Sequence, residues 1–164
     1  MSVSRSQYLF AYGTLRTEEI ESGLHGPKRL STSAAKAPGR LYILKEGYPI
    51  LLIEPGNHIA TASHKWESDW EKACAKLAAG AFRFTSQPSI EGELIEIPWE
   101  RGVFDRPDSW EGFSIGSNSV YQRMAVPVLR ADGVILPAWA YGCTKIPDLA
   151  IPFDGNRWIR PEGL

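Results

Sequence analysis

The sequence predicts an α+β domain in which strands predominate and about two or three helices flank them. Residues 90–97 alternate apolar and polar side chains, as a half-buried strand does. Residues 121–129 and 134–141 are two further strand-like runs, and the Ala-Asp-Gly at 131–133 between them is typical of a hairpin turn. Residues 66–77 instead carry apolar side chains at helical spacing. With 15 Gly, 12 Pro and 6 Trp, the composition indicates many turns and large side chains packed between strands.

Length and charge narrow the class of protein. The chain has 164 residues, which fits one domain over residues 1–164. Its 18 Lys and Arg balance 19 Asp and Glu, so the net charge of −1 lacks the basic excess of a nucleic-acid-binding protein. No apolar run approaches the about 20 residues of a membrane helix, and residues 1–7 lack the apolar core of a signal peptide. These short apolar runs lead us to expect no membrane partner. Cys74 and Cys143 could form one disulfide, but a chain of this size can build a core without it, so we expect a cytoplasmic protein.

The first third of the chain predicts three strands and one short helix. Residues 8–12 are dense in aromatic and apolar side chains and predict a buried strand. Residues 17–22 begin like a helix, with a hydroxyl cap before acidic residues, and nearby Gly and Pro keep that helix short. Residues 35–43 predict a second strand with an irregularity at its Pro-Gly, and residues 48–53 predict a third. The tail from residue 146 is rich in Pro, Gly and Asp and predicts an ordered loop or a short edge element.

Residues 57–89 differ from the strand-rich chain around them and predict a helical insert. The apolar side chains on one helical face are Trp66, Trp70, Ala73, Cys74 and Leu77. The sequence from Ser68 to Glu71 has the form of a capping box, although Trp66 favours an earlier start, and Gly80 is placed to end the helix in a left-handed conformation. Three roles fit the insert: an idle surface segment, a lid over a pocket, or an oligomer contact. We favour a packed insert, because its two Trp side chains must be buried.

Common functional motifs are absent from the sequence, which excludes several classes of enzyme. The chain has no glycine-rich phosphate loop, no glycine fingerprint of dinucleotide-binding domains and no Gly-x-Ser-x-Gly nucleophile elbow. His25, His58 and His64 are spaced too widely to predict a metal site. Cys143 ends a strand, where a cysteine is more often packed than nucleophilic. We therefore expect no metal and no cofactor.

Two segments carry chemistry that a pocket can use. In residues 10–16, Phe-Ala-Tyr-Gly-Thr-Leu-Arg, a buried strand ends in a turn before a short helix, and such a turn exposes backbone N–H groups that bind an anion or an oxyanion. In residues 108–113, Asp-Ser-Trp-Glu-Gly-Phe, Glu111 lies between two aromatic residues. Burial there would raise the pKa of its carboxyl and make it a usable base near neutral pH. Spacing alone favours plainer interpretations, a simple strand-turn-helix and an exposed glutamate.

The turn Tyr12-Gly13-Thr14-Leu15 is similar to a family signature loop at the end of a first strand. Further motifs follow it in the family's order, at residues 39–42, 47–49, 90–94, 110–113, 121–126 and 134–141. Through this ordered set the chain resembles the γ-glutamylcyclotransferase-like superfamily, also called AIG2-like, over roughly residues 8–53 and 91–141.

The resemblance implies both a fold and an activity. The fold is a mixed β-barrel or sheet of about six to seven strands with about two or three flanking helices. The activity converts a γ-glutamyl amide or amine into 5-oxoproline and a free amine, because the substrate's own α-amino group attacks its γ-carbonyl carbon. Such chemistry belongs to glutathione metabolism, is classed as transferase or lyase, and requires no cofactor.

The resemblance also assigns roles to individual residues. Glu111 would take a proton from the substrate amine and pass it to the leaving nitrogen. The residues that would bind substrate are Tyr12, Gly13, Thr14, Leu15 and Tyr121, with the backbone N–H groups of 13–15 on its oxygens. Tyr48 and Arg123 are further candidates. Arg123 shares the strand face of Tyr121 and is either an ion-pair partner or a ligand for the substrate carboxylate.

One position departs from the family pattern. Where Leu-Asp usually precedes the aromatic-Glu-Gly, this chain has Pro107-Asp108, and a proline there would end or prevent a helical turn and move the Glu111 loop. The alternatives are a non-catalytic module on the same scaffold that binds a small molecule or a protein, and a hydrolase with Cys143 as nucleophile. As partners we expect a small γ-glutamyl substrate, no nucleic acid, and a monomer or weak homodimer.

Overall fold

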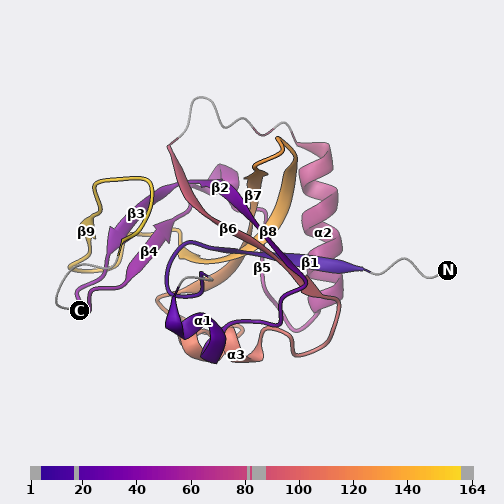
Figure 1. Cartoon of the computed structure of the whole chain (residues 1–164), viewed down its shortest axis with the longest axis horizontal. Helices are drawn as coiled ribbons and strands as arrows, with labels where there is room; N and C mark the ends of the chain where they lie inside the picture. The colour runs from indigo at the N-terminus through magenta and orange to yellow at the C-terminus, as the bar shows by residue number, and fades with distance from the viewer. Residues whose placement is uncertain (1–4, 17–18, 81, 83–87, 160–164) are drawn as a thin grey trace.

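A closed five-stranded barrel forms the centre of the molecule (Figure 1). The computed structural model describes residues 5–16, 19–80, 82 and 88–159. Within them the strands are β1 (Ser6–Ala11), β2 (Ser31–Pro38), β3 (Arg40–Ile43), β4 (Pro49–Leu52), β5 (Ala60–Thr61), β6 (Ser89–Pro98), β7 (Gln122–Arg130), β8 (Ile135–Cys143) and β9 (Ile151–Pro152). The helices are α1 (Ile20–His25), α2 (Trp66–Ala79) and α3 (Asp105–Glu111), with a 3-10 turn at Pro55–Asn57.

Strand pairing closes the barrel and adds a side sheet. The order β7-β2-β6-β1-β8 is closed by antiparallel pairing of β7 with β8. β1 runs antiparallel to β6 and parallel to β8, where Leu9 pairs with Trp139. β4 also runs parallel to β8 and extends the sheet through β3 to β9, while β5 lies beside β7. The α+β barrel prediction is confirmed, and the strands exceed the expected number because short edge strands such as β5 and β9 join the sheet.

The side chains on the two faces of the barrel strands belong to two separate hydrophobic clusters. Alternate side chains such as Phe10, Leu94 and Val126 fill the inner cluster, which contains no helix residue. The opposite side chains, such as Trp139, pack against α2 through Trp70, and further along against the loop before α3. This alternation places Tyr12 with the inner cluster and Tyr141 with the outer one.

Most of the expected elements form. The hairpin β7–β8 turns at Gly133, whose φ of 90° suits the glycine in the expected Asp-Gly turn. Residues 35–43 divide into β2 and β3 at Gly39, where φ is 144° and a Cβ would lie 2.6 Å from the Leu52 carbonyl oxygen. The predicted edge element in the tail is β9. Thr17 and Glu18, the expected cap of α1, lie outside the described residues.

Three details of the expected helix α2 were wrong. The helix begins at Trp66, the earlier start that this residue favoured, with Lys65 as its N-cap and without a side-chain cap; Ser68 therefore lies inside the first turn and forms no capping box. The Asp69 carboxylate instead accepts the Ser63 N–H at 2.7 Å, which ties the preceding loop to the first turn. Gly80 ends the helix in an extended conformation, with φ −94° and ψ 157°.

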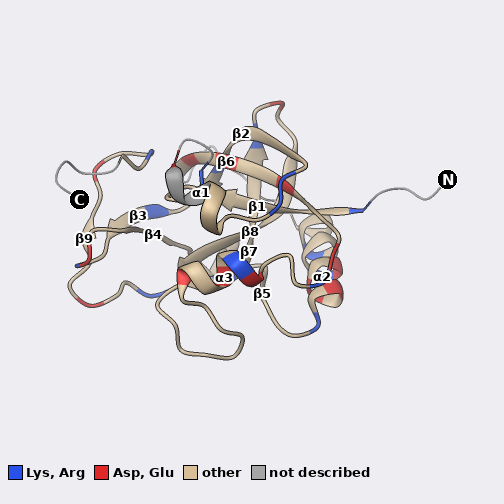
Figure 2. Ribbon diagram, turned by 60° about the horizontal axis from the view of Figure 1, so that its bottom comes forward, with Lys and Arg blue, Asp and Glu red and all other residues tan. Residues whose placement is uncertain are grey.

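The third detail concerns the apolar face of α2. Cys74 is exposed, whereas Trp70 and Ala73 are buried against the barrel, so the helix is rotated away from Cys74. Both α2 and α3 contain acidic as well as basic residues (Figure 2). None of the described helices has the length and apolar character needed to cross a membrane.

Candidate active site

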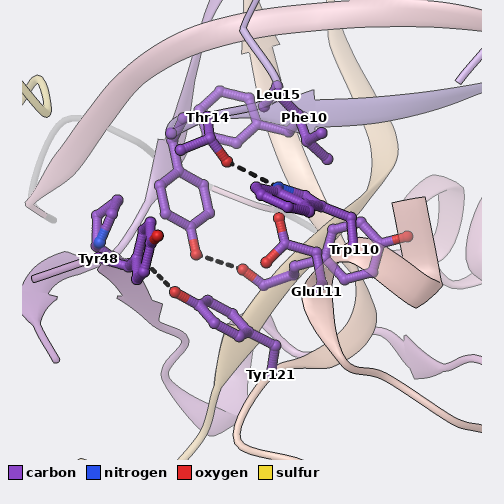
Figure 3. A pocket seen from close by; sticks show the side chains of 12 residues that line it. Phe10, Thr14, Leu15, Tyr48, Trp110, Glu111 and Tyr121 are labelled. Carbon is purple, nitrogen blue, oxygen red and sulfur yellow. Dashed lines mark hydrogen bonds between the residues drawn. The ribbon is translucent and has the colours of Figure 1, made fainter. Parts of the chain in front are cut away.

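The candidate site lies at one end of the barrel, where three strand ends meet. Because β1 runs parallel to β8 and β7 runs antiparallel to it, the end of β1, the end of β8 and the start of β7 share this end. A cavity of about 250 Å³ opens there beside α3 (Figure 3). Its lining consists of Phe10, Ala11, Tyr12, Gly13, Thr14, Leu15, Tyr48, Pro49, Trp110, Glu111, Tyr121 and Tyr141.

The turn after β1 forms one wall of this cavity. Gly13 packs so closely on Pro49 that a Cβ would lie 3.1 Å from the proline Cγ. The turn closes with a hydrogen bond from the Arg16 N–H to the Gly13 carbonyl at 3.1 Å. Thr14 Oγ1 accepts the Trp110 indole N–H at 3.1 Å. The described residues offer no acceptor to the backbone N–H groups of Gly13, Thr14 and Leu15, so these donors remain available to a bound molecule.

Tyr12 is a buried residue of the cavity wall, and its hydroxyl forms hydrogen bonds with two backbone groups of the protein. It donates to the Tyr141 carbonyl oxygen and accepts the Leu51 N–H at 3.0 Å. Burial is the main cause that raises the pKa of Tyr12. Tyr121 donates to the Pro49 carbonyl oxygen at 2.6 Å, and burial likewise raises its pKa. Both tyrosines are therefore neutral and shape the cavity with their rings.

Glu111 is the last residue of α3 and faces the turn across the cavity. Gly112 follows in the left-handed conformation with φ 68°, and its N–H caps the helix at the carbonyls of Asp108 and Ser109. The expectation that Pro107 prevents a helical turn was wrong. Pro107 is the third residue of α3, within the first turn, where backbone N–H groups have no intrahelical partner, so its missing N–H costs nothing.

The surroundings of Glu111 make its carboxyl less acidic. Burial is the larger cause, and the negative charge of Asp108 is the second; together they raise the pKa of Glu111 from 4.5 to about 7. A carboxyl with this pKa is partly ionised at neutral pH. It can therefore both accept and return a proton there.

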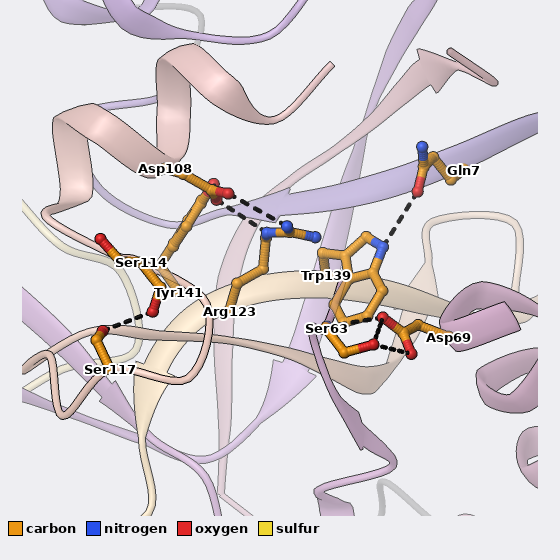
Figure 4. Close-up of polar contacts among 9 residues, drawn as sticks. All are labelled: Gln7, Ser63, Asp69, Asp108, Ser114, Ser117, Arg123, Trp139 and Tyr141. Carbon is orange, nitrogen blue, oxygen red and sulfur yellow. Dashed lines mark hydrogen bonds and ion pairs between the residues drawn. The ribbon is translucent and has the colours of Figure 1, made fainter. Parts of the chain in front are cut away.

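Asp108, which precedes Glu111 by three residues in α3, forms a largely buried ion pair with Arg123 (Figure 4). Arg123 donates Nε to Asp108 Oδ1 at 2.9 Å and Nη2 to Oδ2 at 3.2 Å, and the Tyr141 hydroxyl donates to Oδ1 at 2.6 Å. The guanidinium also lies 4.1 Å from the ring centroid of Phe104. Arg123 lines a second cavity, of about 240 Å³, rather than the one beside Glu111. Of the two roles left open by the sequence, the geometry matches the ion-pair partner.

The remaining sequence candidates lie in different environments. Tyr48 lines the cavity at its mouth and is 48% exposed. Cys143 is buried and absent from the lining, and burial raises the pKa of its thiol to about 11, which makes it a poor nucleophile. The described part of the chain holds no group of three or more His, Cys, Asp or Glu placed to bind a metal ion. No described residue of the 57–89 segment lines the cavity, so a lid role for that segment has no support in the geometry.

Several lining residues were missed by the sequence interpretation. Trp110 donates its indole N–H to Thr14, and Tyr141 donates its hydroxyl to Asp108. Trp110 stands beside Glu111 in the sequence, and that adjacency was an available signal. Tyr141 is separated from Asp108 by 33 positions, and only strand pairing brings it to the site. Phe10, Ala11 and Pro49 complete the lining; they lie within the segments 10–16 and 47–49 that the sequence singled out, although none was named as a site residue.

Known proteins resemble this chain both in sequence, over part of its length, and in fold. Residues 9–79 match the model of the family described as gamma-glutamyl cyclotransferase, AIG2-like. No curated protein matches the sequence. An AIG2-like protein from Mus musculus shares the fold with a TM-score of 0.60 and 18% identity, over 94% of this chain and 89% of that chain.

Two further solved structures share the fold. YkqA from Bacillus subtilis has a TM-score of 0.54 and 17% identity over 94% of this chain and 40% of that one. A protein from Arabidopsis thaliana, solved in solution, has a TM-score of 0.51 and 18% identity over 91% of this chain and 76% of that one. Residues 9–79, which include the turn after β1, therefore match the AIG2-like family, and the chain as a whole shares the fold of the AIG2-like protein from Mus musculus.

Proposed function

We propose that this protein is a cyclotransferase that converts a γ-glutamyl amide or amine into 5-oxoproline and a free amine. One observation carries the proposal. Glu111, with a carboxyl pKa of about 7, faces the turn of residues 12–15 and its available backbone N–H groups across a single cavity (Figure 3). A proton acceptor opposite oxyanion donors is the arrangement that intramolecular aminolysis requires.

The reaction proceeds through one tetrahedral intermediate. The Glu111 carboxylate accepts a proton from the substrate's α-ammonium group, whose ordinary pKa is about 8. The amine lone pair then forms a C–N bond to the γ-carbonyl carbon, and the carbonyl oxygen becomes an oxyanion held by the N–H groups of residues 13–15. Glu111 gives its proton to the leaving nitrogen and takes the extra proton of the ring nitrogen. The carbonyl re-forms, the old C–N bond breaks, and this last proton leaves with the released amine.

The lining of the cavity favours such a substrate. Burial raises the pKa values of Tyr12, Tyr121 and Tyr141, so Glu111 is the one lining group that titrates near neutral pH. A substrate ammonium beside Glu111 therefore meets an opposite charge and no competing cation from the lining. We expect the aromatic walls to hold the glutamyl chain folded, which supplies proximity.

The test is turnover of a panel of γ-glutamyl substrates, with 5-oxoproline release as the readout. The panel contains γ-glutamyl dipeptides, γ-glutamyl-lysine amines and simple γ-glutamyl amines. We expect at least one to be turned over, and Glu111→Gln to lower the rate by about 10³-fold with an unchanged circular dichroism spectrum. Full activity in Glu111→Gln would exclude Glu111 as the base.

The second candidate is a non-catalytic binding module. It rested on Pro107 disturbing the Glu111 loop, and the position of Pro107 in the first turn of α3 removes that reason. Binding of 5-oxoproline beside Thr14 and Glu111 with no turnover of any panel member would favour the module over the enzyme.

A further inference from the structure

The Gly13 carbonyl of the candidate oxyanion-binding turn is held by one arginine. Besides the Arg16 backbone N–H, the Arg16 side-chain Nε donates to this oxygen at 3.2 Å. Arg16 is 3% exposed, its Nη2 donates to the Trp158 carbonyl oxygen at 2.9 Å, and the same nitrogen lies 3.4 Å from Glu19 Oε1. The guanidinium thus joins the turn after β1 to Trp158, a buried residue in an otherwise exposed stretch of the chain.

This contact adds to the turn hydrogen bond from the Arg16 backbone N–H, and together the two fix where the next backbone N–H points. In a trans peptide the C=O and N–H of one unit point in opposite directions. The oxygen of Gly13 and the N–H of Thr14 belong to the same unit, so an oxygen held by Arg16 leaves the Thr14 N–H on the opposite side. A peptide unit that follows a glycine has unusual freedom to rotate, and a partly buried, charge-assisted hydrogen bond restricts that freedom.

We propose that Arg16 is a positioning residue that aims the Thr14 N–H into the cavity and so completes the oxyanion-binding site; this rests on the proposed cyclotransferase function. Arg16 does not line the cavity and touches no reacting atom. It acts through the Gly13–Thr14 peptide.

The chain supplies a matched control in Arg29. Its Nη2 donates to the Leu15 carbonyl oxygen at 2.7 Å, two residues further along the same turn. The N–H in that peptide unit is the one of Arg16, which already donates to the Gly13 carbonyl. Arg29 therefore also holds a carbonyl of this turn, but one whose partner N–H is not offered to a substrate.

The test compares substitutions that keep different parts of the Arg16 side chain. In Arg16→Gln the amide nitrogen stands at the position of Nε and can still donate to Gly13, while the link to Trp158 is lost. In Arg16→Lys the positive charge is kept, but a methylene group replaces Nε. We expect Arg16→Lys to lower kcat by about 10- to 100-fold with a nearly unchanged KM, since a lost oxyanion donor costs about 10²- to 10³-fold. Arg16→Gln should lose about fivefold or less, and Arg29→Lys about threefold or less.

A substrate-free measurement separates this proposal from the proposed function. The amide ¹⁵N and ¹H shifts and the hydrogen-exchange rate of Thr14 should change in Arg16→Lys and stay near the wild-type values in Arg16→Gln and Arg29→Lys. If the wild type turns over no γ-glutamyl substrate, the proposed function fails while the Thr14 signals still decide the role of Arg16. Wild-type kcat and Thr14 signals in Arg16→Lys would overturn the proposal. The proposal would also be overturned if kcat fell in Arg16→Gln and Arg16→Lys only in proportion to the fall in melting temperature of each variant.

Discussion

Glu111 is the residue whose environment sets the expected pH dependence. A base with a pKa of about 7 is inactive when protonated, so kcat/KM should rise tenfold per pH unit below pH 7 and level off above it. The measurement is a pH–rate profile on a γ-glutamyl substrate from pH 5 to pH 8. A profile that is already flat at pH 5 would show that the active carboxylate is not the buried Glu111.

Asp108 links the pKa of Glu111 to the buried ion pair. In Asp108→Asn the second cause of the raised pKa disappears, so the rising limb of the pH profile should move to lower pH. The same change leaves the Arg123 guanidinium buried without its carboxylate, which should cost about 2–4 kcal/mol of unfolding free energy in urea. The double variant Asp108→Asn/Arg123→Met removes the unpaired charge. It should recover part of that stability while keeping the shifted limb.

Helix α2 illustrates an element that stabilises the fold without entering the site. Trp70 is buried between Tyr8 and Trp139, with ring centroids 6.3 Å and 6.2 Å away. Trp70→Ala should therefore lower the unfolding free energy by about 3–5 kcal/mol and leave KM unchanged at temperatures where the variant is folded. Lys72→Ala on the exposed face of α2 is the control and should change stability by less than about 0.5 kcal/mol. A raised KM in Trp70→Ala would mean that α2 contributes to substrate binding.

The interpretation of residues 57–89 as an insert into the family core stays a prediction.

The sequence did not predict helix α3, because Pro107 lies where the helix forms. Proline disfavours the interior of a helix, and the sequence alone does not say that the helix begins only two residues before Pro107. The start of α3 is set by the loop before it, where the Asp105 N–H bonds to the Gly102 carbonyl at 3.0 Å and Phe104 packs on Trp139. The start of α2 was uncertain for the same reason. Tertiary contacts, rather than caps, decide where these two helices begin.

The raised pKa of Glu111 should affect the stability of the whole molecule, because it predicts a lower free energy of unfolding at high pH. Its pKa is raised in the folded state, so the folded protein binds more protons than the unfolded chain between about pH 4.5 and pH 7, and stability falls as pH rises through that window. Glu111→Gln removes this ionisation and should be more stable than the wild type by about 1–3 kcal/mol at pH 8, with little difference at pH 4. Thermal melts of both proteins across this range measure the effect. Equal pH dependence in the two proteins would contradict the buried, raised-pKa carboxyl.

The sequence by itself determined the strand runs, the amphipathic helix, the β7–β8 hairpin and the order of the family motifs. These depend on local periodicity and on turn chemistry, which neighbouring residues carry. It also singled out Glu111 and residues 12–15, because a strand-end turn and a glutamate between aromatic residues are local patterns. Their roles remain predictions until turnover is measured.

Only the tertiary structure decided what surrounds these groups. Closure of the barrel through the parallel β1–β8 pair and the β7–β8 ladder brings Tyr141 to Asp108. The same closure turns Arg123 toward that carboxylate and away from the Glu111 cavity. Arg16 meets Trp158, 142 positions along the chain, by the same kind of long-range packing. Contacts across such separations leave no periodic trace in the sequence, since they arise from strand register and burial rather than from neighbouring residues.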